Sequence, residues 1–238
     1  MRTVKRINQR IDYTPDDITP KRKKQPTKPP KTASQAERII DELYQRNPLL
    51  ALTASMSALT GLRYSDASWL KFSDFRNEFG QWKESFDVCQ QKTFNMRLAR
   101  GASRADAYRE SIVRIYINDG IRDIVEECKL LSCSKEFLFA NSRSSIRTED
   151  GEVIHRPMDI RSANYHHEAV RKKLKLDFEF GTHSWRKYFA KKLLNKEGVT
   201  LDQVRDCLGQ SSLTSTNHYL VNFDEELSAP ISKMTLFE

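Results

Sequence analysis

The chain has 238 residues, of which 38% are hydrophobic and 30% are charged, and its formal net charge at pH 7 is +8. This composition suits one globular domain with a terminal arm, and it excludes a protein that is disordered throughout, because the chain has enough apolar residues to form a core. No apolar run approaches the ~20 residues of a transmembrane helix, and no apolar segment of a secretory signal follows the N-terminal residues.

The positive charge is concentrated near the N-terminus. Residues 1–35 hold ten basic and three acidic side chains, which is +7 of the total of +8. The same stretch has five prolines and few large apolar residues, so residues 1–33 are predicted to form a basic arm that is disordered or extended. A polyanion is the natural partner of such an arm, and the alternative is a solubilising leader. The densest group of candidate contacts is Lys21, Arg22, Lys23 and Lys24.

Helix signals follow the arm. Ser34 is predicted to cap a first helix whose apolar residues share one face. Asn47-Pro48 is a second start, because proline is favoured in the first turn of a helix. The apolar segment 49–59 is predicted to lie at the centre of the core and to end at Gly61. Ser65 is predicted to cap a further short helix.

Strand signals come next. Residues 86–90 alternate in polarity, and residues 112–117 are β-branched or aromatic. A short helix is expected in the polar stretch 97–110. From Gly120 onward the apolar residues recur with a helical period. Helices are predicted near 119–131, 158–174, 183–196, 200–208 and 213–221. The predicted fold class is α+β, mostly α, with a small antiparallel sheet on one edge.

The domain plan is a single globular domain over residues 34–221, followed by a tail over residues 222–238. The four cysteines have no CxxC spacing, which argues against a zinc site and favours reduced cytosolic thiols. The sequence also lacks the GxxxxGK[ST] pattern of a phosphate-binding loop and an acidic metal cluster.

Four separate segments combine into one pattern. They are Thr60-Gly61-Leu62-Arg63-Tyr64-Ser65-Asp66, His183-Ser184-Trp185-Arg186, Leu208-Gly209-Gln210-Ser211-Ser212 and Tyr219. Arginine binds a phosphate in a bidentate manner and keeps its proton, and a histidine and an arginine three residues apart share one helical face. In order and spacing, the set resembles the catalytic residues of the tyrosine recombinase (phage integrase) family. The resemblance covers roughly residues 34–230 and implies the fold of that family's catalytic domain.

The resemblance implies a role for each member of the set. Arg63 and Arg186 would bind the scissile phosphate, and Tyr219 would be the nucleophile. His183 would take part in proton transfer and contact an oxygen of the phosphate. A free tyrosine titrates near ~10, so attack at neutral pH needs a base or a positive field nearby. Attack would form a 3′-phosphotyrosyl link that keeps the energy of the broken bond. The family therefore uses no metal and no nucleotide cofactor.

Three further residues are assigned by the same resemblance. Lys92 matches a lysine on a β-hairpin loop that protonates the leaving 5′-hydroxyl, with Lys83 as the weaker candidate. Asp66 matches an acidic residue that orients the first arginine, and it also suits a helix N-terminus. Gln210 departs from the family, which mostly has histidine or tryptophan there. Because an amide also donates hydrogen bonds, we interpret Gln210 as a tolerated substitution.

The resemblance also implies partners. Double-stranded DNA is the expected substrate, and a homo-oligomer, expected to be a tetramer on paired sites, would bind it. The expected location is the cytoplasm, in a prokaryote or as the product of a phage or mobile element, and no membrane partner is expected. The tail, residues 222–238, either docks on a neighbouring protomer or packs on its own domain. Arg63 lies too near the N-terminus for a preceding helical DNA-clamping domain, so a minimal recombinase, similar in plan to the fimbrial-switch invertases, or a fragment is expected.

Two other functions remain open. A type IB topoisomerase has a similar constellation and relaxes supercoils without site preference, but the segment Leu208–Ser212 favours a recombinase. A DNA-binding regulator that keeps the fold without cleaving is the other alternative, and Gln210 is its best support. The target sequence and the type of recombination event cannot be read from the spacing of residues.

Overall fold

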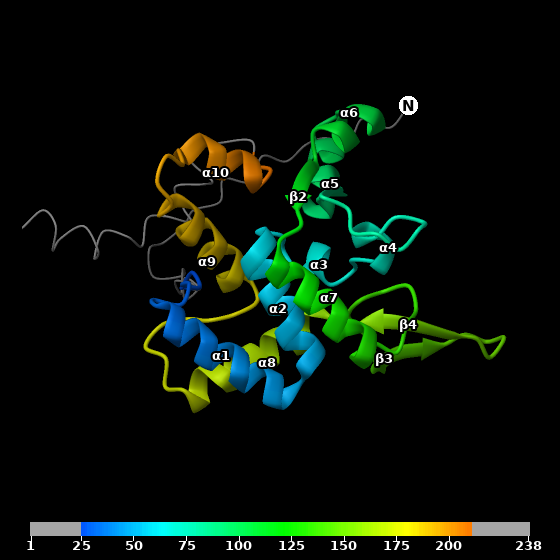
Figure 1. Cartoon of the computed structure of the whole chain (residues 1–238), viewed down its shortest axis with the longest axis horizontal. Helices are drawn as coiled ribbons and strands as arrows, with labels where there is room; N and C mark the ends of the chain where they lie inside the picture. Colours follow the sequence, from blue (N-terminus) through cyan, green and yellow to red (C-terminus); the bar gives the residue numbers. More distant parts are fainter. Residues whose placement is uncertain (1–24, 211–238) are drawn as a thin grey trace, which may run out of the picture.

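The computed structural model describes residues 25–210, which form ten helices and four strands (Figure 1). In chain order they are α1 (Ala33–Arg46), α2 (Pro48–Thr60), α3 (Tyr64–Ala67), α4 (Phe72–Phe75), β1 (Ser85–Cys89), α5 (Gln91–Ala99), α6 (Arg104–Arg109), β2 (Ile112–Tyr116), α7 (Asp119–Leu131), β3 (Ala140–Arg147), β4 (Val153–Pro157), α8 (Ile160–Lys173), α9 (His183–Leu194) and α10 (Leu201–Cys207). The mostly helical fold class with small antiparallel pairing is confirmed.

The first two helices begin at local signals in the sequence. Thr32, and not Ser34 as expected, caps α1 by accepting a hydrogen bond from the backbone of Gln35. Asn47 caps α2, with Pro48 in the first turn, and α2 ends at Gly61 with φ 71°. Nine of the thirteen residues of α2 are buried, and the helix packs on α1, α7 and α9. The prediction of a central apolar helix that ends at Gly61 is confirmed.

The prediction of a Ser65 cap is wrong. Arg63 occupies the N-cap position of α3 without a side-chain capping bond, and the helix ends at Ala67. The reason is the burial of the flanking residues: Leu62 is fully buried, and the hydroxyl of Tyr64 donates to the carbonyl of Met158 at 2.9 Å. These contacts start the helix earlier than the serine would.

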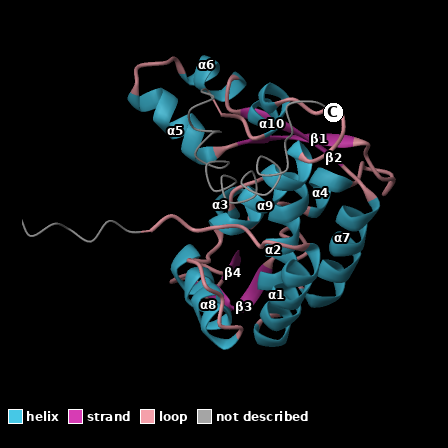
Figure 2. Ribbon diagram, turned by 90° about the vertical axis from the view of Figure 1, so that its left-hand side faces the viewer, coloured by secondary structure: helices cyan, strands magenta, loops and turns pink. Residues whose placement is uncertain are grey.

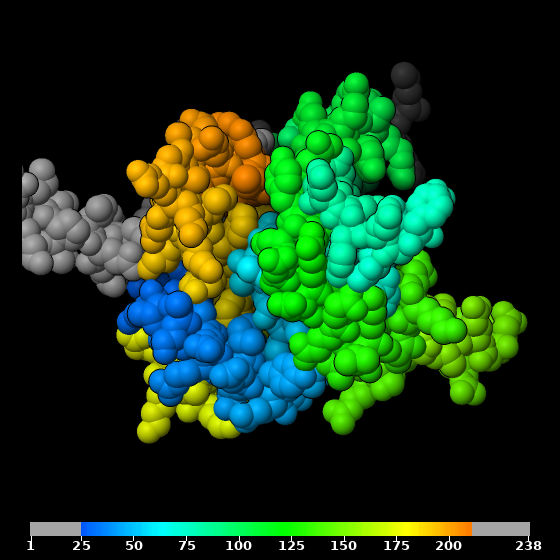
Figure 3. Space-filling view, viewed as in Figure 1, coloured from blue at the N-terminus to red at the C-terminus, as the bar shows by residue number. Residues whose placement is uncertain are grey.

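The sheet structure differs in part from the prediction. β1 and β2 pair antiparallel as expected, with Phe86 opposite Ile115. The polar stretch between them holds two helices, α5 and α6, where one was expected. A second antiparallel pair, β3 with β4, lies between the helices predicted at 119–131 and 158–174, in a stretch for which no helix or strand was predicted. Most of this hairpin is exposed, and it projects from the body of the molecule (Figures 1 and 3). Because neither face of the hairpin is buried along its length, its sequence shows little alternation of apolar and polar residues.

Two main hydrophobic clusters share α2. One contains Met56 of α2 together with residues of β1, β2 and α7. The other contains Leu50 of α2 together with residues of α1, α8 and α9, including the fully buried Trp185. Burying a leucine side chain stabilises a fold by about 1.5–3 kcal/mol, so a helix that is buried on two faces contributes strongly to the stability of the domain. Figure 2 shows α2 and α9 between the β1–β2 pair on one side and α1 with α8 on the other.

A third, smaller cluster joins α9 to α10. Ala190 of α9 packs with Val204 and Leu208, which are fully buried. α7 has the predicted bounds, and α8, α9 and α10 lie within two residues of their predicted ends. The helix predicted over 213–221 lies outside the described residues. None of the described helices is long and apolar enough to cross a membrane.

The end of the basic arm lies against the domain. Residues 25–32 have no helix or strand, and the Lys187 ammonium donates to the carbonyl of Thr27 at 2.5 Å. The backbone of Lys28 donates to the carbonyl of Glu179 at 2.8 Å. These residues therefore run in extended form along the start of α9.

Candidate active site

Arg63 leaves the core on a short, tightly held connection. Gly61 ends α2 in the left-handed region, and a Cβ there would lie 2.6 Å from the ring of Phe189 on α9. The glycine therefore allows α2 and α9 to approach closely at this end. Leu62 is buried, and the Arg63 side chain that follows keeps 16% of its exposure.

Arg186 comes from the first turn of α9 and is fully buried. Its Nη1 donates to the carbonyl of Gly61 at 2.5 Å, and its Nη2 donates to the carbonyl of Leu208 at 2.6 Å. The two carbonyls come from the end of α2 and the end of α10. A buried guanidinium needs such acceptors, because an unpaired charge in the interior is costly. Arg186 is thus fixed between two segments far apart in sequence.

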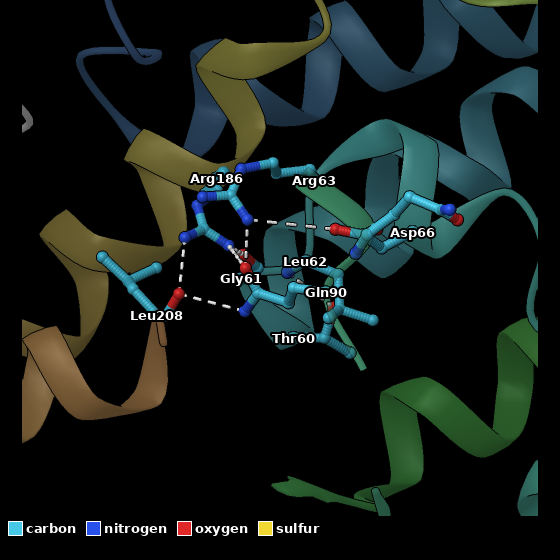
Figure 4. A network of polar contacts seen from close by, with 9 residues as sticks. Thr60, Gly61, Leu62, Arg63, Asp66, Gln90, Arg186 and Leu208 are labelled. Carbon is cyan, nitrogen blue, oxygen red and sulfur yellow. Dashed lines mark hydrogen bonds and ion pairs between the residues drawn. The ribbon is translucent and has the colours of Figure 1, made fainter. Parts of the chain in front are cut away.

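The two arginines meet at one oxygen atom. Arg63 Nη1 donates to Oε1 of Gln90, and Arg186 Nη1 lies 3.5 Å from the same oxygen (Figure 4). Nε2 of Gln90 donates to the carbonyl of Leu208 at 3.0 Å. The structure therefore brings together two guanidinium groups that are far apart in the chain, as the sequence pattern requires.

Asp66 lies beneath this pair and is buried. Its Oδ2 is 4.0 Å from Nη1 of Arg63, and its Oδ1 accepts from the backbone of Gln91 at 3.1 Å. Burial raises the pKa of the carboxyl, while the Gln91 hydrogen bond and the charges of Arg63 and Arg186 lower it in part. Asp66 therefore connects the first arginine to the start of α5, which is consistent with the predicted orienting role.

His183 shares the N-terminal face of α9 with Arg186. Its pKa is lowered from 6.5 to about 4, first by burial and then by nearby positive charges. In decreasing order these charges belong to Arg186, Lys187, Arg63 and Lys92. The imidazole is therefore neutral at pH 7 and able to accept a proton.

Lys92 was predicted to lie on a β-hairpin loop, and this prediction is wrong. It is exposed in the first turn of α5, because the connection between β1 and β2 is helical. Its charge nevertheless acts on His183. Lys83, the weaker candidate, donates to the carbonyl of Ser73 at 2.8 Å and is not among the charges that act on His183. The structure thus favours Lys92 over Lys83.

Gln210 is the last described residue and is half-buried. Its backbone donates to the carbonyl of Arg205 at 3.1 Å, directly after Gly209 with φ 59°. A Cβ on Gly209 would lie 2.6 Å from Val113 Cγ1, so this turn is packed against β2. Tyr219 and the basic group Lys21, Arg22, Lys23 and Lys24 lie outside the described residues, and their roles stay predictions.

Gln90 is the residue that sequence reasoning missed. It is the last residue of the strand predicted over 86–90 and precedes the lysine motif, but nothing in its neighbourhood indicates that it is only 1% exposed. Its partners are 27, 96 and 118 positions away, beyond any local pattern. Among residues 25–210, no group of three or more His, Cys, Asp or Glu side chains is arranged to hold a metal ion.

Comparison with known proteins gives one family and several similar folds. A sequence model described as the phage integrase family matches residues 31–226. No curated protein sequence matches the chain.

Among solved structures, XerH recombinase in a post-cleavage complex with its palindromic difH substrate has a TM-score of 0.57 and 18% identity, over 88% of this chain and 54% of that one. XerA recombinase has a TM-score of 0.58 and 16% identity, over 93% and 68% of the two chains. A lambda integrase tetramer bound to a Holliday junction has a TM-score of 0.54 and 19% identity, over 83% and 49%. The chain thus spans about half the length of the XerH and lambda integrase chains.

Proposed function

Because this chain belongs to the phage integrase family and has the fold of a tyrosine recombinase catalytic domain, we propose that it is a site-specific DNA recombinase. It cleaves and rejoins DNA strands through a covalent 3′-phosphotyrosyl intermediate. The observation that carries this proposal is the meeting of Arg63 and Arg186 at one oxygen acceptor. Two guanidinium groups held at this spacing suit the binding of one phosphodiester.

The two arginines act on the charge that develops at phosphorus. In the transition state the non-bridging oxygens gain negative charge, and donors that are already oriented stabilise it. Arg186 is held by the carbonyls of Gly61 and Leu208, so its guanidinium needs little reorganisation when the substrate binds. Arg63 is more exposed and faces the incoming phosphate from the end of α2.

Proton transfer completes the reaction. The Tyr219 oxygen forms a bond to phosphorus while the bond from phosphorus to the 5′-oxygen breaks. Neutral His183 is placed in the positive field that favours loss of the phenolic proton, and it accepts that proton directly or through solvent. Lys92 donates a proton to the leaving 5′-oxygen. The reverse reaction, with a different 5′-hydroxyl, rejoins the strand, so neither a metal nor a nucleotide is consumed.

The partners follow from this chemistry. The substrate is double-stranded DNA, and the working form is a homotetramer on two paired sites, as in the lambda integrase tetramer on a Holliday junction. Lys21, Arg22, Lys23 and Lys24 of the arm contact backbone phosphates. The protein acts in the cytoplasm of a prokaryotic host and originates from a phage or another mobile element.

The test is the covalent intermediate itself. The full chain is incubated with a nicked suicide substrate taken from the DNA that flanks its gene, and adducts are separated under denaturing conditions. The expected result is a protein–DNA adduct that Tyr219→Phe abolishes. A mobility shift without any adduct would instead support a DNA-binding regulator. Adducts on unrelated DNA, together with relaxation of a supercoiled plasmid, would support a type IB topoisomerase.

A further inference from the structure

Gln90 has a buried polar side chain, and its backbone is held by hydrogen bonds on both sides. It lies directly after β1 and at the N-cap position of α5, and its side chain is 1% exposed. Its backbone N–H donates to the carbonyl of Ser111 at 2.8 Å, and its own carbonyl accepts from Phe94 at 2.9 Å. Strand pairing on one side and the helix on the other therefore fix the position of its Cα.

Both ends of the Gln90 amide are used. Oε1 accepts from Arg63 and lies 3.5 Å from Arg186 Nη1, while Nε2 donates to the carbonyl of Leu208 at 3.0 Å. That carbonyl also accepts from Arg186 Nη2 at 2.6 Å. The amide, the guanidinium of Arg186 and the Leu208 carbonyl thus form a closed ring of contacts, with Arg63 joined to it through Oε1 (Figure 4).

Glutamine suits this position for a chemical reason. The site needs an acceptor facing two cations and, at the other end of the same group, a donor facing a carbonyl. Glutamate would offer an acceptor to the cations but a second negative oxygen to the carbonyl. Methionine has a similar length and offers neither strong acceptor nor donor. The amide also packs under the turn, because a Cβ on Gly209 would lie 2.9 Å from Gln90 Nε2.

We propose that Gln90 is a positioning residue that sets the spacing and orientation of the Arg63 and Arg186 guanidinium groups and ties them to the Leu208–Gly209 turn. Two like charges that arrive from unconnected segments repel each other, and the amide oxygen between them offsets this repulsion. The inference rests on the proposed recombinase function, and it concerns how the phosphate-binding pair is held in place. In this proposal Gln90 acts through the two arginines.

The first experiment compares Gln90→Met with Gln45→Met in the full chain. Gln45 is exposed on α1, so its variant controls for the change of amide to thioether. The rate of adduct formation is measured in single turnover, alongside noncovalent DNA affinity in the Tyr219→Phe background. Gln90→Met is expected to slow adduct formation by about 10- to 100-fold, since a small misplacement of phosphate-binding groups has an effect of this size. Gln45→Met is expected to react like the native chain.

A second readout separates positioning from general destabilisation. A substrate with a neutral methylphosphonate at the scissile position lacks the oxygen charge on which the arginines act. The native chain should therefore react much more slowly with it than with the phosphodiester. In Gln90→Met this ratio of rates should shrink by about tenfold, because misaligned guanidinium groups discriminate less. A slower variant with an unchanged ratio would mean that Gln90 is only structural, and the inference would be wrong.

Gln90→Glu keeps the test decisive where Gln90→Met does not fold. It preserves size and the acceptor but loses the donor to Leu208, and thermal unfolding is measured first. A folded Gln90→Glu whose adduct rate falls by about fivefold or more, with a reduced methylphosphonate ratio, supports the inference. A smaller loss overturns it. If the native chain forms no adduct at all, the recombinase function fails, and this outcome is distinct from that of an active native chain with unaffected Gln90 variants.

Discussion

Two arginine-bearing regions of the molecule hold their charges in opposite ways. Around Gln90, Arg63 and Arg186 are fixed by an amide and two backbone carbonyls. On the β3–β4 hairpin, the guanidinium groups of Arg143 and Arg156 make no ion pair or hydrogen bond with another of residues 25–210. Fixed guanidinium groups suit a transition state, whereas adjustable cations suit a backbone whose path varies. The two regions therefore differ in how firmly their guanidinium groups are held, and under the proposed function only the first would act on the scissile phosphate.

The sharpest way to break this contrast is to remove Arg186. Arg186→Ala removes the Arg186 donor from the carbonyls of Gly61 and Leu208, and the Leu208 carbonyl keeps only its bond from Gln90, so the free energy of unfolding should fall by about 2–4 kcal/mol. Under the proposed function, adduct formation should fall by about 100- to 1,000-fold, because a donor to the scissile phosphate is removed. Chemical denaturation and single-turnover rates measure the two effects.

Arg186→Lys is the matching comparison. It keeps the charge but cannot reach both carbonyls with the geometry of a guanidinium, so it should remain strongly impaired. If Arg186→Lys reacted at nearly the native rate, fixed geometry at this position would not be important.

Acid stability sharpens the contrast further. The pKa of His183 is lowered to about 4 in the folded protein, whereas the unfolded chain has the ordinary value of 6.5. Between these two pH values the unfolded chain binds a proton that the folded protein does not. The resulting stability is complete above pH 6.5 and is lost as the pH falls toward 4, with a limit of about 3 kcal/mol. His183→Gln should therefore flatten the pH dependence of the unfolding free energy between pH 6.5 and 4.

His167 provides the internal reference for that measurement. Its pKa is also lowered to about 4, mainly by burial, and its Nε2 accepts from Trp185 at 2.9 Å. The acid sensitivity that remains in His183→Gln should therefore belong largely to His167. An unchanged pH profile in His183→Gln would show that His183 is charged or solvated in the folded protein.

A smaller effect is expected at the Leu208–Gly209 turn, which packs against Gln90. Gly209→Ala places a Cβ at φ 59°, 2.6 Å from Val113 and 2.9 Å from Gln90 Nε2, so it should destabilise the fold by about 2–3 kcal/mol and slow adduct formation. Gly198→Ala is the control, because its φ of 77° has the same backbone cost but nothing lies within 4 Å of its Cβ. Equal unfolding free energies for the two variants would contradict close packing at the turn.

The smallest effect on stability is expected at the hairpin. The double variant Arg143→Ala/Arg156→Ala should change the unfolding free energy by less than about 0.5 kcal/mol. Its DNA affinity should fall, with a slope against salt that is shallower by about 1 for each phosphate that is no longer neutralised. Arg122→Ala/Lys129→Ala on α7 removes the same net charge from cations that are paired with acids. Equal DNA affinities of the two double variants would mean that only total charge matters.

The sequence predicted the elements that have local signals. Asn47-Pro48 and Gly61 mark the two ends of α2, and the apolar content between them indicates burial on all sides. The residue set around Arg63 and Arg186 was accessible through its resemblance to a family, although its catalytic role stays a prediction. The hairpin was missed because exposed strands of polar residues show neither a helical nor a strand period.

Long-range contacts were beyond the sequence. Gln90 is chemically indistinguishable from its neighbour Gln91, yet one side chain is buried between two arginines and the other is exposed. The difference arises from tertiary packing, because the Gln90 side chain contacts Arg63, Arg186 and the Leu208 carbonyl at the end of α10. Lys92 was assigned to a hairpin loop through the resemblance to the family, but the stretch between β1 and β2 is long enough for two helices.

The Leu208 carbonyl has a consequence for timing. It is the single atom that accepts from both Arg186 and Gln90, and it ends the helix from which the chain continues toward residue 219. A displacement of α10 therefore disturbs the contacts of Arg186 and Gln90, and under the proposed function it would also move the start of the segment that leads to the nucleophile. The alignment of the two guanidinium groups is therefore linked to the position of α10, and in the proposed recombinase this linkage would disfavour DNA cleavage before the protein has assembled.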